Sequence, residues 1–412
     1  MQIREFLRAG HTPTLVSAFL YFDISFMAWV LIGALANSIA ADFGLADWQK
    51  GLMVAVPILG GAVLRLVLGP LGDHIGGRRA GIAGLVLTLL PLVLGWLWAD
   101  SFVQLLVVGF LLGVAGASFA VALPLASRWY PARYQGLAMG IAGAGNSGTA
   151  LATFFGPRLA EQLGWHAVFG MAAVAVAATL AVFALLAKDS PQQPAPKRLA
   201  DYWSVLHERD TWWFSLFYSV TFGGFVGLAS FLSIFFREQY ELSRVAAGSF
   251  ATLCVFAGSM LRPVGGYLAD RFGGIRMLTV LYVAVGAIML GVASLPSLGV
   301  ATAVLFVGMG LLGMGNGSVF QLVPQRFSKE IGVITGIVGA AGGVGGFILP
   351  NVLGSVKQLT GSFGGGFLLF ALVAFACAGA LLHVSRIWQG AFVARGGLAA
   401  SLVPVPIEAE RD

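Results

Sequence analysis

The sequence predicts an all-α polytopic membrane protein with twelve transmembrane helices in two pseudo-symmetric six-helix bundles. Of its 412 residues, 58% are hydrophobic and only 10% are charged, well below the roughly 25% charged residues of soluble domains. Apolar runs such as residues 80–99 are about 20 residues long, which is the length that crosses the hydrocarbon core of a bilayer. A segment of the first half also recurs 197 residues later. These three observations together predict the fold class.

Twelve apolar segments are long enough to span a membrane. Six precede and six follow a long polar stretch whose Pro, Gln and Lys content indicates a linker. We therefore expect an N-terminal six-helix bundle over residues 1–187, a cytoplasmic linker over 188–210, a C-terminal six-helix bundle over 211–388 and a cytoplasmic tail over 389–412. The predicted spans are centred near residues 27, 60, 89, 115, 147, 176, 224, 256, 285, 310, 343 and 375.

The distribution of positive charge predicts the orientation of the chain. Seventeen of the 24 lysines and arginines fall in segments on the side of the two termini, five fall on the opposite side and two lie within spans. Because cytoplasmic loops carry an excess of Lys and Arg, both termini are expected in the cytoplasm. The net charge of +6 then faces the lipid headgroups of the cytoplasmic leaflet, and no nucleic-acid partner is indicated. We expect a monomer in the cytoplasmic (inner) membrane.

The repeated segment reads GAVLRLVLGPLGDHIGGRR at residues 61–79 and GSMLRPVGGYLADRFGGIR at residues 258–276, with ten identities in 19 positions. The same segment at the same place in two halves predicts a substrate site between the halves, near the bilayer midplane. Acidic and basic side chains of the loop that closes each copy can bridge to one another or to helix ends. We expect this loop to latch one conformation through Asp73, Arg79, Asp270 and Arg276.

Each copy also places an arginine inside a span. Arg65 and Arg262 lie eight residues before their loop aspartates, about 12 Å along the helix and hence near mid-depth. A charge at that depth is costly unless it is shielded or used. Of the 18 acidic residues, only Asp23 lies well inside a span, so two buried arginine–carboxylate pairs cannot form. The arginine pair therefore predicts a binding site for a transported anion.

Several stretches resemble a known family. The loops GPLGDHIGGRR and GGYLADRFGGIR resemble the inter-helix signature of the major facilitator superfamily. GIAGAGNSGTAL in span 5, GIVGAAGGVGGFILP in span 11, SLFYSVTFGGFVG in span 7 and ASFAVALPLASRWYP at the end of span 4 are similar to its nitrate/nitrite porter family. The resemblance covers spans 1 to 11. It departs after AGAGN, where Thr149 and Ala150 follow Gly148 in place of further glycines, and fine selectivity stays open.

The resemblance implies the major facilitator fold and a secondary active transporter of nitrate, nitrite or both, working by alternating access. Proton-coupled uptake and nitrate/nitrite exchange both remain open. In such a porter two arginines clamp the anion, an amide and a phenol donate hydrogen bonds, and three phenylalanines form aromatic walls. The residues that match these roles are Arg65, Arg262, Asn146, Tyr218, Phe26, Phe119 and Phe222. A planar guanidinium also suits a planar oxyanion better than an ammonium does.

For three side chains the sequence leaves two interpretations open. Asp23 is either a proton carrier or a fixed partner of a nearby cation or donor. Asn316 and Gln321, in span 10, either line the transport pathway or bond neighbouring helices together.

Two rival functions also remain. One is a carrier of another small monovalent anion, such as formate or a short carboxylate, and the other is a non-transporting membrane sensor. A sensor should carry a sizeable soluble output segment, and neither the linker nor the tail is long enough. The sequence contains no nucleophile–base set, phosphate-binding loop or metal-spaced cluster, so we expect no enzyme activity, no cofactor and no metal site.

Overall fold

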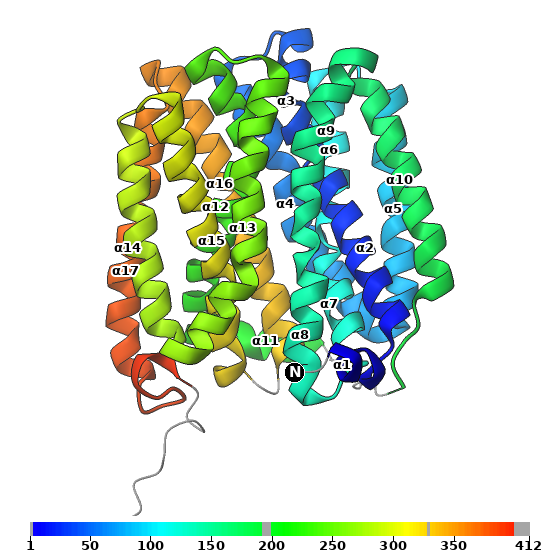
Figure 1. Ribbon diagram of the computed structural model, residues 1–412, viewed down its shortest axis with the longest axis vertical. Helices are drawn as coiled ribbons and strands as arrows, with labels where there is room; N and C mark the ends of the chain where they lie inside the picture. Colours follow the sequence, from blue (N-terminus) through cyan, green and yellow to red (C-terminus); the bar gives the residue numbers. More distant parts are fainter. Residues whose placement is uncertain (1–2, 192–198, 328–329, 399–412) are drawn as a thin grey trace, which may run out of the picture.

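The structure is a computed structural model that describes residues 3–191, 199–327 and 330–398. Its helices run side by side along one axis (Figure 1). The first half consists of α2 (Thr12–Trp29), α3 (Leu31–Phe43), α4 (Asp47–Ile75), α5 (Gly77–Leu97), α6 (Phe102–Gly116), α7 (Phe119–Ser127), α8 (Ala132–Gly143), the 3₁₀ turn η1 (Ala144–Ser147), α9 (Gly148–Leu163) and α10 (Trp165–Leu186). The second half consists of α12 (Arg209–Tyr240), α13 (Arg244–Phe272), α14 (Gly274–Ala293), α15 (Leu298–Arg326), α16 (Ile331–Thr360) and α17 (Gly364–Trp388).

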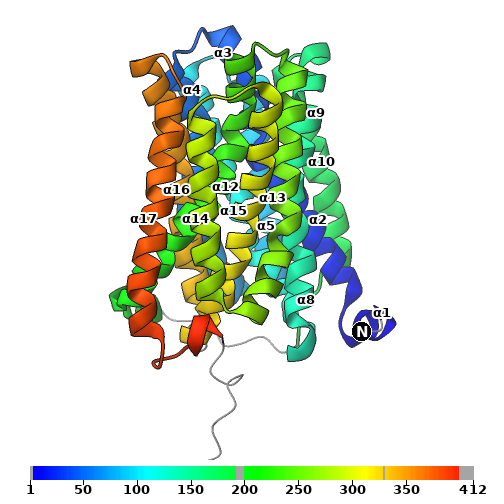
Figure 2. The ribbon, with the colours of Figure 1, turned by 60° about the vertical axis from the view of Figure 1, so that its left-hand side comes forward.

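Three short elements lie at one end of the bundle, where the described chain begins and ends (Figures 1 and 2). They are α1 (Ile3–Ala9), α11 (Leu199–His207) and the 3₁₀ turn η2 (Arg395–Gly397). We call this end the terminal end and the opposite end the distal end. The turn η2 folds back against α13 and α14 (Figure 2).

Eleven helical segments in the described parts of the chain are long and apolar enough to cross a membrane. The span expected near residue 147 is not among them, because η1 separates α8 from α9 and neither helix alone has the required length. The 3₁₀ turn falls on the glycine-rich AGNS sequence, where small residues allow a local change of helix type. With this interrupted span counted, the predicted twelve spans are present.

The repeated loops make the same turn in both halves. Gly76, between α4 and α5, has φ +91°, and Gly273, between α13 and α14, has φ +93°. Only glycine adopts this conformation without strain. A Cβ at Gly76 would also lie 2.6 Å from a carboxylate oxygen of Asp189, and one at Gly273 would lie 2.2 Å from the carbonyl oxygen of Gly396. Each half therefore needs a glycine here, because the turn has a positive φ and another segment of the chain packs directly against it.

Two helix pairs form the most extensive contacts between the halves. In the first pair, α16 lies against α4, and a Cβ at Gly343 would lie 2.7 Å from that of Ala62. In the second pair, α13 lies against α9, where the hydroxyls of Thr153 and Thr252 are 2.8 Å apart. Small residues let membrane helices approach closely. The interface between the halves is thus tight, and the arginines lie on two of its four helices.

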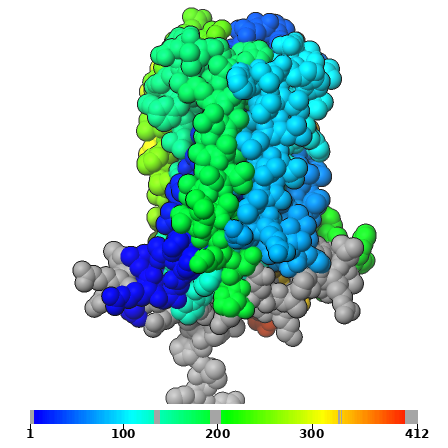
Figure 3. All heavy atoms as spheres, turned by 90° about the vertical axis from the view of Figure 1, so that its right-hand side faces the viewer, coloured from blue at the N-terminus to red at the C-terminus, as the bar shows by residue number. Residues whose placement is uncertain are grey.

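The outer faces of the bundle are apolar. Figure 3 shows one such face, formed by α5 in blue and α10 in green. Large hydrophobic side chains are exposed along both helices, including Leu87, Leu90, Leu97, Val174 and Leu185. A continuous apolar surface of this height fits contact with lipid tails. The polar groups of the protein are turned inward or gathered at its two ends.

Candidate functional site

Arg65 is buried in the centre of the molecule, on α4. Its side chain is 1% exposed. Nη1 donates a hydrogen bond of 2.6 Å to the carbonyl oxygen of Gly339, in the other half, and Nη2 donates one of 2.9 Å to the carbonyl oxygen of Gly116. Nε has no partner. The guanidinium is thus oriented by backbone carbonyls and retains unused hydrogen-bonding capacity.

Arg262 approaches the same place from α13. The centres of both guanidinium groups lie near the ring centroid of Phe119, at 5.4 Å for Arg65 and 5.2 Å for Arg262. The hydroxyl of Tyr218 lies within electrostatic range of both, and Nη1 of Arg262 is buried without a partner. The structure therefore brings together four residues that the sequence assigned to one site, from α4, α7, α12 and α13.

Aromatic rings enclose the two cations. Phe222 lies 5.5 Å from the Arg65 guanidinium and stacks on Tyr218 with ring centroids 5.1 Å apart. Phe320 of α15 contacts both Tyr218, at 4.9 Å, and Phe119, at 6.3 Å. Ring faces attract cations and exclude bulky groups. Aromatic walls of this kind favour a thin, flat ligand beside the two guanidinium groups.

Phe26, the third phenylalanine predicted for the aromatic walls, connects to Phe119 through Phe22. Its ring is fully buried and packs against Phe22, at 4.4 Å, and Trp29, at 4.9 Å. Phe22 in turn contacts Phe119 at 5.7 Å. Phe26 therefore supports the aromatic wall through Phe22.

The charge of the arginine pair is not balanced inside the protein. Among the side chains that the structure describes, no carboxylate oxygen lies within 4.0 Å of either guanidinium. Arg65, which is fully buried, and Arg262, which is partly buried, face one ring, repel each other and lack a partner of opposite charge. An anion bound between them would supply that partner.

Asn146 lies in η1, beside the arginine helix α13. Its carbonyl oxygen accepts a hydrogen bond of 3.2 Å from Ser259 Oγ, one turn before Arg262. The side chain is 1% exposed, and neither of its amide atoms has a partner. A buried amide without hydrogen bonds is costly, so this side chain is available to a ligand.

Comparison of the sequence with known proteins identifies the family of this chain. The sequence pattern that defines the Major Facilitator Superfamily matches residues 17–350. The chain is 36% identical over 371 residues to the nitrite extrusion protein of Bacillus subtilis, covering 88% of this chain and 91% of that protein. It is 35% identical over 385 residues to the probable nitrate/nitrite transporter NarK2 of Mycobacterium tuberculosis, covering 91% and 97%.

The chain belongs to the nitrate/nitrite porter family of this superfamily. The resemblance seen in the sequence is thereby confirmed. A further member is the probable nitrate/nitrite antiporter NarK1 of Thermus thermophilus, 33% identical over 412 residues, covering 90% of this chain and 91% of that protein.

Solved structures confirm the fold of the porter. A bacterial homologue of the human lysosomal transporter Spinster, in an inward-facing and occupied conformation, superposes with a TM-score of 0.69 at 17% identity, covering 90% of this chain and 96% of that chain. The human organic anion transporter MFSD10 superposes with a TM-score of 0.71 at 16% identity, covering 90% and 99%. At these identities the likeness establishes the architecture alone.

Asp23 of the porter does not face the arginines. Its carboxylate accepts a hydrogen bond of 2.6 Å from Ser147 Oγ and interacts with the backbone N–H of Gly148. The backbones also meet here, since a Cβ at Gly148 would overlap the carbonyl of Asp23. Asp23 is thus bound to the interrupted span. The sequence left open whether Asp23 pairs with a nearby cation or with a hydrogen-bond donor. The structure shows the donor, Ser147, and no arginine within ion-pair distance of Asp23 among the described residues.

The distal end of the porter is closed by bonds between the halves. Asn37 Nδ2 donates to the carbonyl oxygen of Ser233 at 2.9 Å, and Ser233 Oγ donates to that of Gly33 at 3.2 Å. Lys50 Nζ forms an ion pair of 2.6 Å with Glu238. These contacts join α3 to α12 and α4 to α12. They hold the halves together on the side away from the termini.

The terminal end of the first half contains one latch predicted from the repeat. Asp73 accepts a hydrogen bond of 2.6 Å from Arg128, at the end of α7. The other carboxylate oxygen of Asp73 lies 3.9 Å from where a Cβ of Gly332, at the start of α16, would be. Arg79 is exposed. The loop aspartate thus meets an arginine, but the partner is Arg128, which the sequence interpretation did not select.

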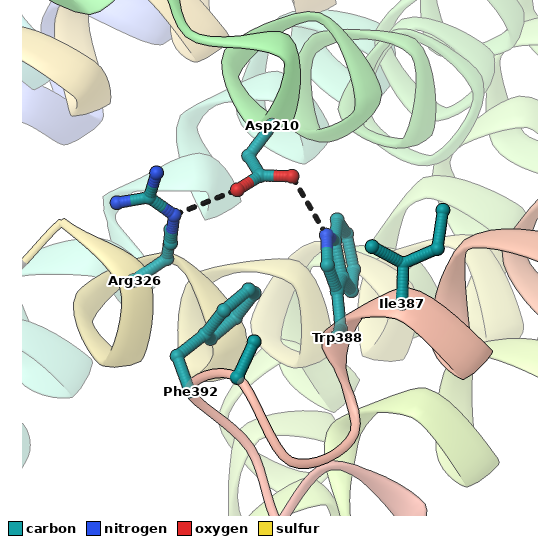
Figure 4. Close-up of a pocket in the computed structure, with 6 residues that line it drawn as sticks. Asp210, Arg326, Ile387, Trp388 and Phe392 are labelled. Carbon is teal, nitrogen blue, oxygen red and sulfur yellow. Dashed lines mark hydrogen bonds and ion pairs between the residues drawn. The ribbon is translucent and has the colours of Figure 1, made fainter.

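The second half is arranged differently at the same end. Arg326, at the end of α15, binds Asp210 through Nε at 2.6 Å and Glu208 through Nη2 at 2.8 Å. Asp210 also accepts a hydrogen bond of 2.8 Å from Trp388 Nε1. A small cavity of about 320 Å³ is lined by Asp210, Arg326, Ile387, Trp388, Ala391 and Phe392 (Figure 4). Because both carboxylates already neutralise Arg326, this cavity is not an anion site.

The remaining predicted latch residues, in the second half, form no ion pair with each other in the part of the chain that the structure describes. Asp270 is hydrogen-bonded to the side chain of Gln321, on α15, so Gln321 bonds two neighbouring helices. Asp270 and Arg276 are both exposed. The Arg276 side chain packs against Gly396, whose Cβ would lie 2.7 Å from Nε. The loop aspartate thus has different partners in the two halves, an arginine in the first and a glutamine in the second.

Proposed function

We propose that this porter carries nitrate, nitrite or both across the cytoplasmic membrane by alternating access. The observation that carries the proposal is the pair of guanidinium groups that share the Phe119 ring and have no carboxylate partner among the described residues. Arg65 is fully buried, and Nη1 of Arg262 is buried without a partner. Nitrate and nitrite are planar, monovalent and weakly hydrated, so they match guanidinium forks and aromatic walls. The curated relatives, which are named for nitrate or nitrite, support this choice of anion.

The transport cycle follows from what the anion does to the site. Without it, Arg65 is held by carbonyls of both halves, and the two cations repel each other. A bound anion offsets this repulsion and draws Arg65 and Arg262 toward one point. Because the two residues lie in different halves, binding favours a closed state from which either end can open. The distal bonds between α3, α4 and α12 would break when the distal end opens.

Membrane placement and residue roles are part of the proposal. The terminal end faces the cytoplasm, in keeping with the excess of Lys and Arg there, and the protein acts as a monomer. Asn146 and Tyr218 donate hydrogen bonds to the anion, and Phe119 and Phe222 form the walls. Uptake with protons and exchange of nitrate for nitrite are both compatible with this site.

The test is flux of nitrate and nitrite into proteoliposomes, with internal pH recorded. Arg65→Lys and Arg262→Lys keep the charge and lose the planar fork, so each should reduce transport to a few per cent of wild type or less. Arg237→Lys is the matched control, because Arg237 only donates to the Leu242 carbonyl oxygen at the distal end of α12. Near wild-type rates in either site variant would refute the two-arginine site. Saturable formate flux without nitrate or nitrite flux would favour the rival carrier.

A further inference from the structure

Asn316 occupies a position on α15 that the proposed site does not yet use. One turn later on the same helix face, Phe320 contacts Tyr218 and Phe119 of the arginine site. Neighbouring positions of α15 face other helices. A Cβ at Gly317 would meet the Arg262 carbonyl oxygen of α13 at 2.4 Å, and one at Gly315 would meet Thr221 of α12 at 2.6 Å. Asn316 therefore lies between α12 and α13, one turn toward the distal end from Phe320.

The amide of Asn316 has no partner in the protein. The side chain is 1% exposed, and both its nitrogen and its oxygen lack a hydrogen bond. Ser318, two residues later, is bonded to the carbonyl oxygens of Gly265 and Met314. Gln321 turns away, with its oxygen 2.4 Å from where a Cβ of Gly274 would be. The interhelical bond that the sequence allowed for Asn316 is thus not formed.

The two arginines and two asparagines account for many of the unsatisfied buried polar atoms. Of the fourteen buried side-chain nitrogen and oxygen atoms without partners in the described residues, six belong to Arg65, Arg262, Asn146 and Asn316. Proteins rarely leave buried polar atoms unpaired, and such a group points to a missing ligand. Arg65, Arg262 and Asn146 already belong to the proposed site, and Asn316 shares their property.

We propose that Asn316 is a fifth polar residue, beside Arg65, Arg262, Asn146 and Tyr218, that contacts the transported anion through its Nδ2–H donors. The inference rests on the proposed function. Nitrate and nitrite only accept hydrogen bonds, so a neutral donor adds affinity without adding charge to an already doubly cationic site. Asn316 would reach the anion from α15, a direction that neither α4, α13 nor η1 covers. The alternative is a structural amide that binds neighbouring helices through a buried water.

The decisive variant is Asn316→Leu, which has a similar volume and no polar atoms. If the amide serves the anion, its loss should weaken nitrate binding roughly 10- to 150-fold, the range for one hydrogen bond to a charged ligand. The melting temperature of the substrate-free protein should stay the same or rise, because an unpaired buried polar group is removed. If the amide is structural, the melting temperature should fall and the nitrate affinity should change little.

Calorimetric binding of nitrate and nitrite in detergent, together with thermal unfolding, measures both quantities. Asn316→Ala provides a second variant that removes the amide without adding volume. Ser318→Ala is the matched control on the same helix, expected to lower stability modestly and to leave affinity unchanged. Unchanged affinity in both Asn316 variants, while wild type binds nitrate or nitrite, would overturn the inference alone. A wild-type protein that binds neither anion would overturn the proposed function and the inference with it.

Discussion

The Arg65 guanidinium donates a hydrogen bond of 2.6 Å to the carbonyl oxygen of Gly339, 274 residues later and in the opposite half of the bundle. This bond joins α4 to α16 at the proposed substrate site. It is possible because Gly339 has no side chain, since a Cβ there would lie 3.0 Å from Nη1 and 3.2 Å from Cδ of Arg65. The residue that we propose to bind the anion thus also forms a contact between the two halves.

Gly339→Ala should therefore weaken nitrate binding without removing any polar group. The added methyl displaces the Arg65 side chain by a few tenths of an ångström, which disturbs its alignment with the anion, and we expect a loss of affinity of roughly 10-fold. Gly336→Ala, one turn earlier on α16, is the control, because a Cβ there meets nothing within 4 Å. Calorimetric dissociation constants that are equal in the two variants would show that the Gly339 contact does not position Arg65.

Composition and the repeat were sufficient to predict the fold. Apolar length sets the number of spans, and an arginine at the same place in two copies indicates a site on the pseudo-symmetry axis. The interruption of span 5 was not predicted, because a 3₁₀ turn such as η1 leaves no distinct signal in a glycine-rich run.

The site was predicted as far as residue type and span determine it. Arg65, Arg262, Phe119, Tyr218 and Phe222 meet as expected. Phe320 was missed, although it follows Asn316 by one helical turn and the two share a face. The carbonyl partners of Arg65 could not be predicted either, because every residue has a carbonyl and only tertiary packing selects Gly116 and Gly339.

The two expected donors should each contribute measurably to binding. Asn146→Ala removes an amide with no partner in the protein, and Tyr218→Phe removes a hydroxyl that lies beside both guanidinium groups. Each should raise the nitrate dissociation constant by roughly 10- to 150-fold, equivalent to about 1.5–3 kcal/mol. Calorimetry on the purified variants measures this. Unchanged constants in both variants would remove these residues from the site.

The latch at the terminal end should depend on Arg128 and not on Arg79. Arg128→Gln breaks the 2.6 Å pair with Asp73, which lies next to α16 of the other half. Transport at saturating nitrate should fall several-fold with little change in affinity, because the pair stabilises one conformation and does not touch the anion. Arg79→Gln, at an exposed position, should transport at nearly the wild-type rate. Equal losses in both variants would indicate that loop charge matters and that the specific pair does not.

Asp23 distinguishes symport from exchange. Asp23 is 6% exposed, and its carboxylate accepts a hydrogen bond from the Ser147 hydroxyl. Asp23→Asn keeps an acceptor oxygen for that hydroxyl and mimics the protonated acid. If Asp23 carries the proton, the variant should still exchange nitrate for nitrite, because exchange needs no net proton movement. It should lose uptake driven by an inward proton gradient, and internal acidification should disappear with that uptake. Ser147→Ala removes the hydrogen bond but not the titratable group, and should retain both modes. Proton-driven uptake that persists at full rate in Asp23→Asn would exclude the carrier role and leave Asp23 as a structural acceptor that holds the interrupted span against α2.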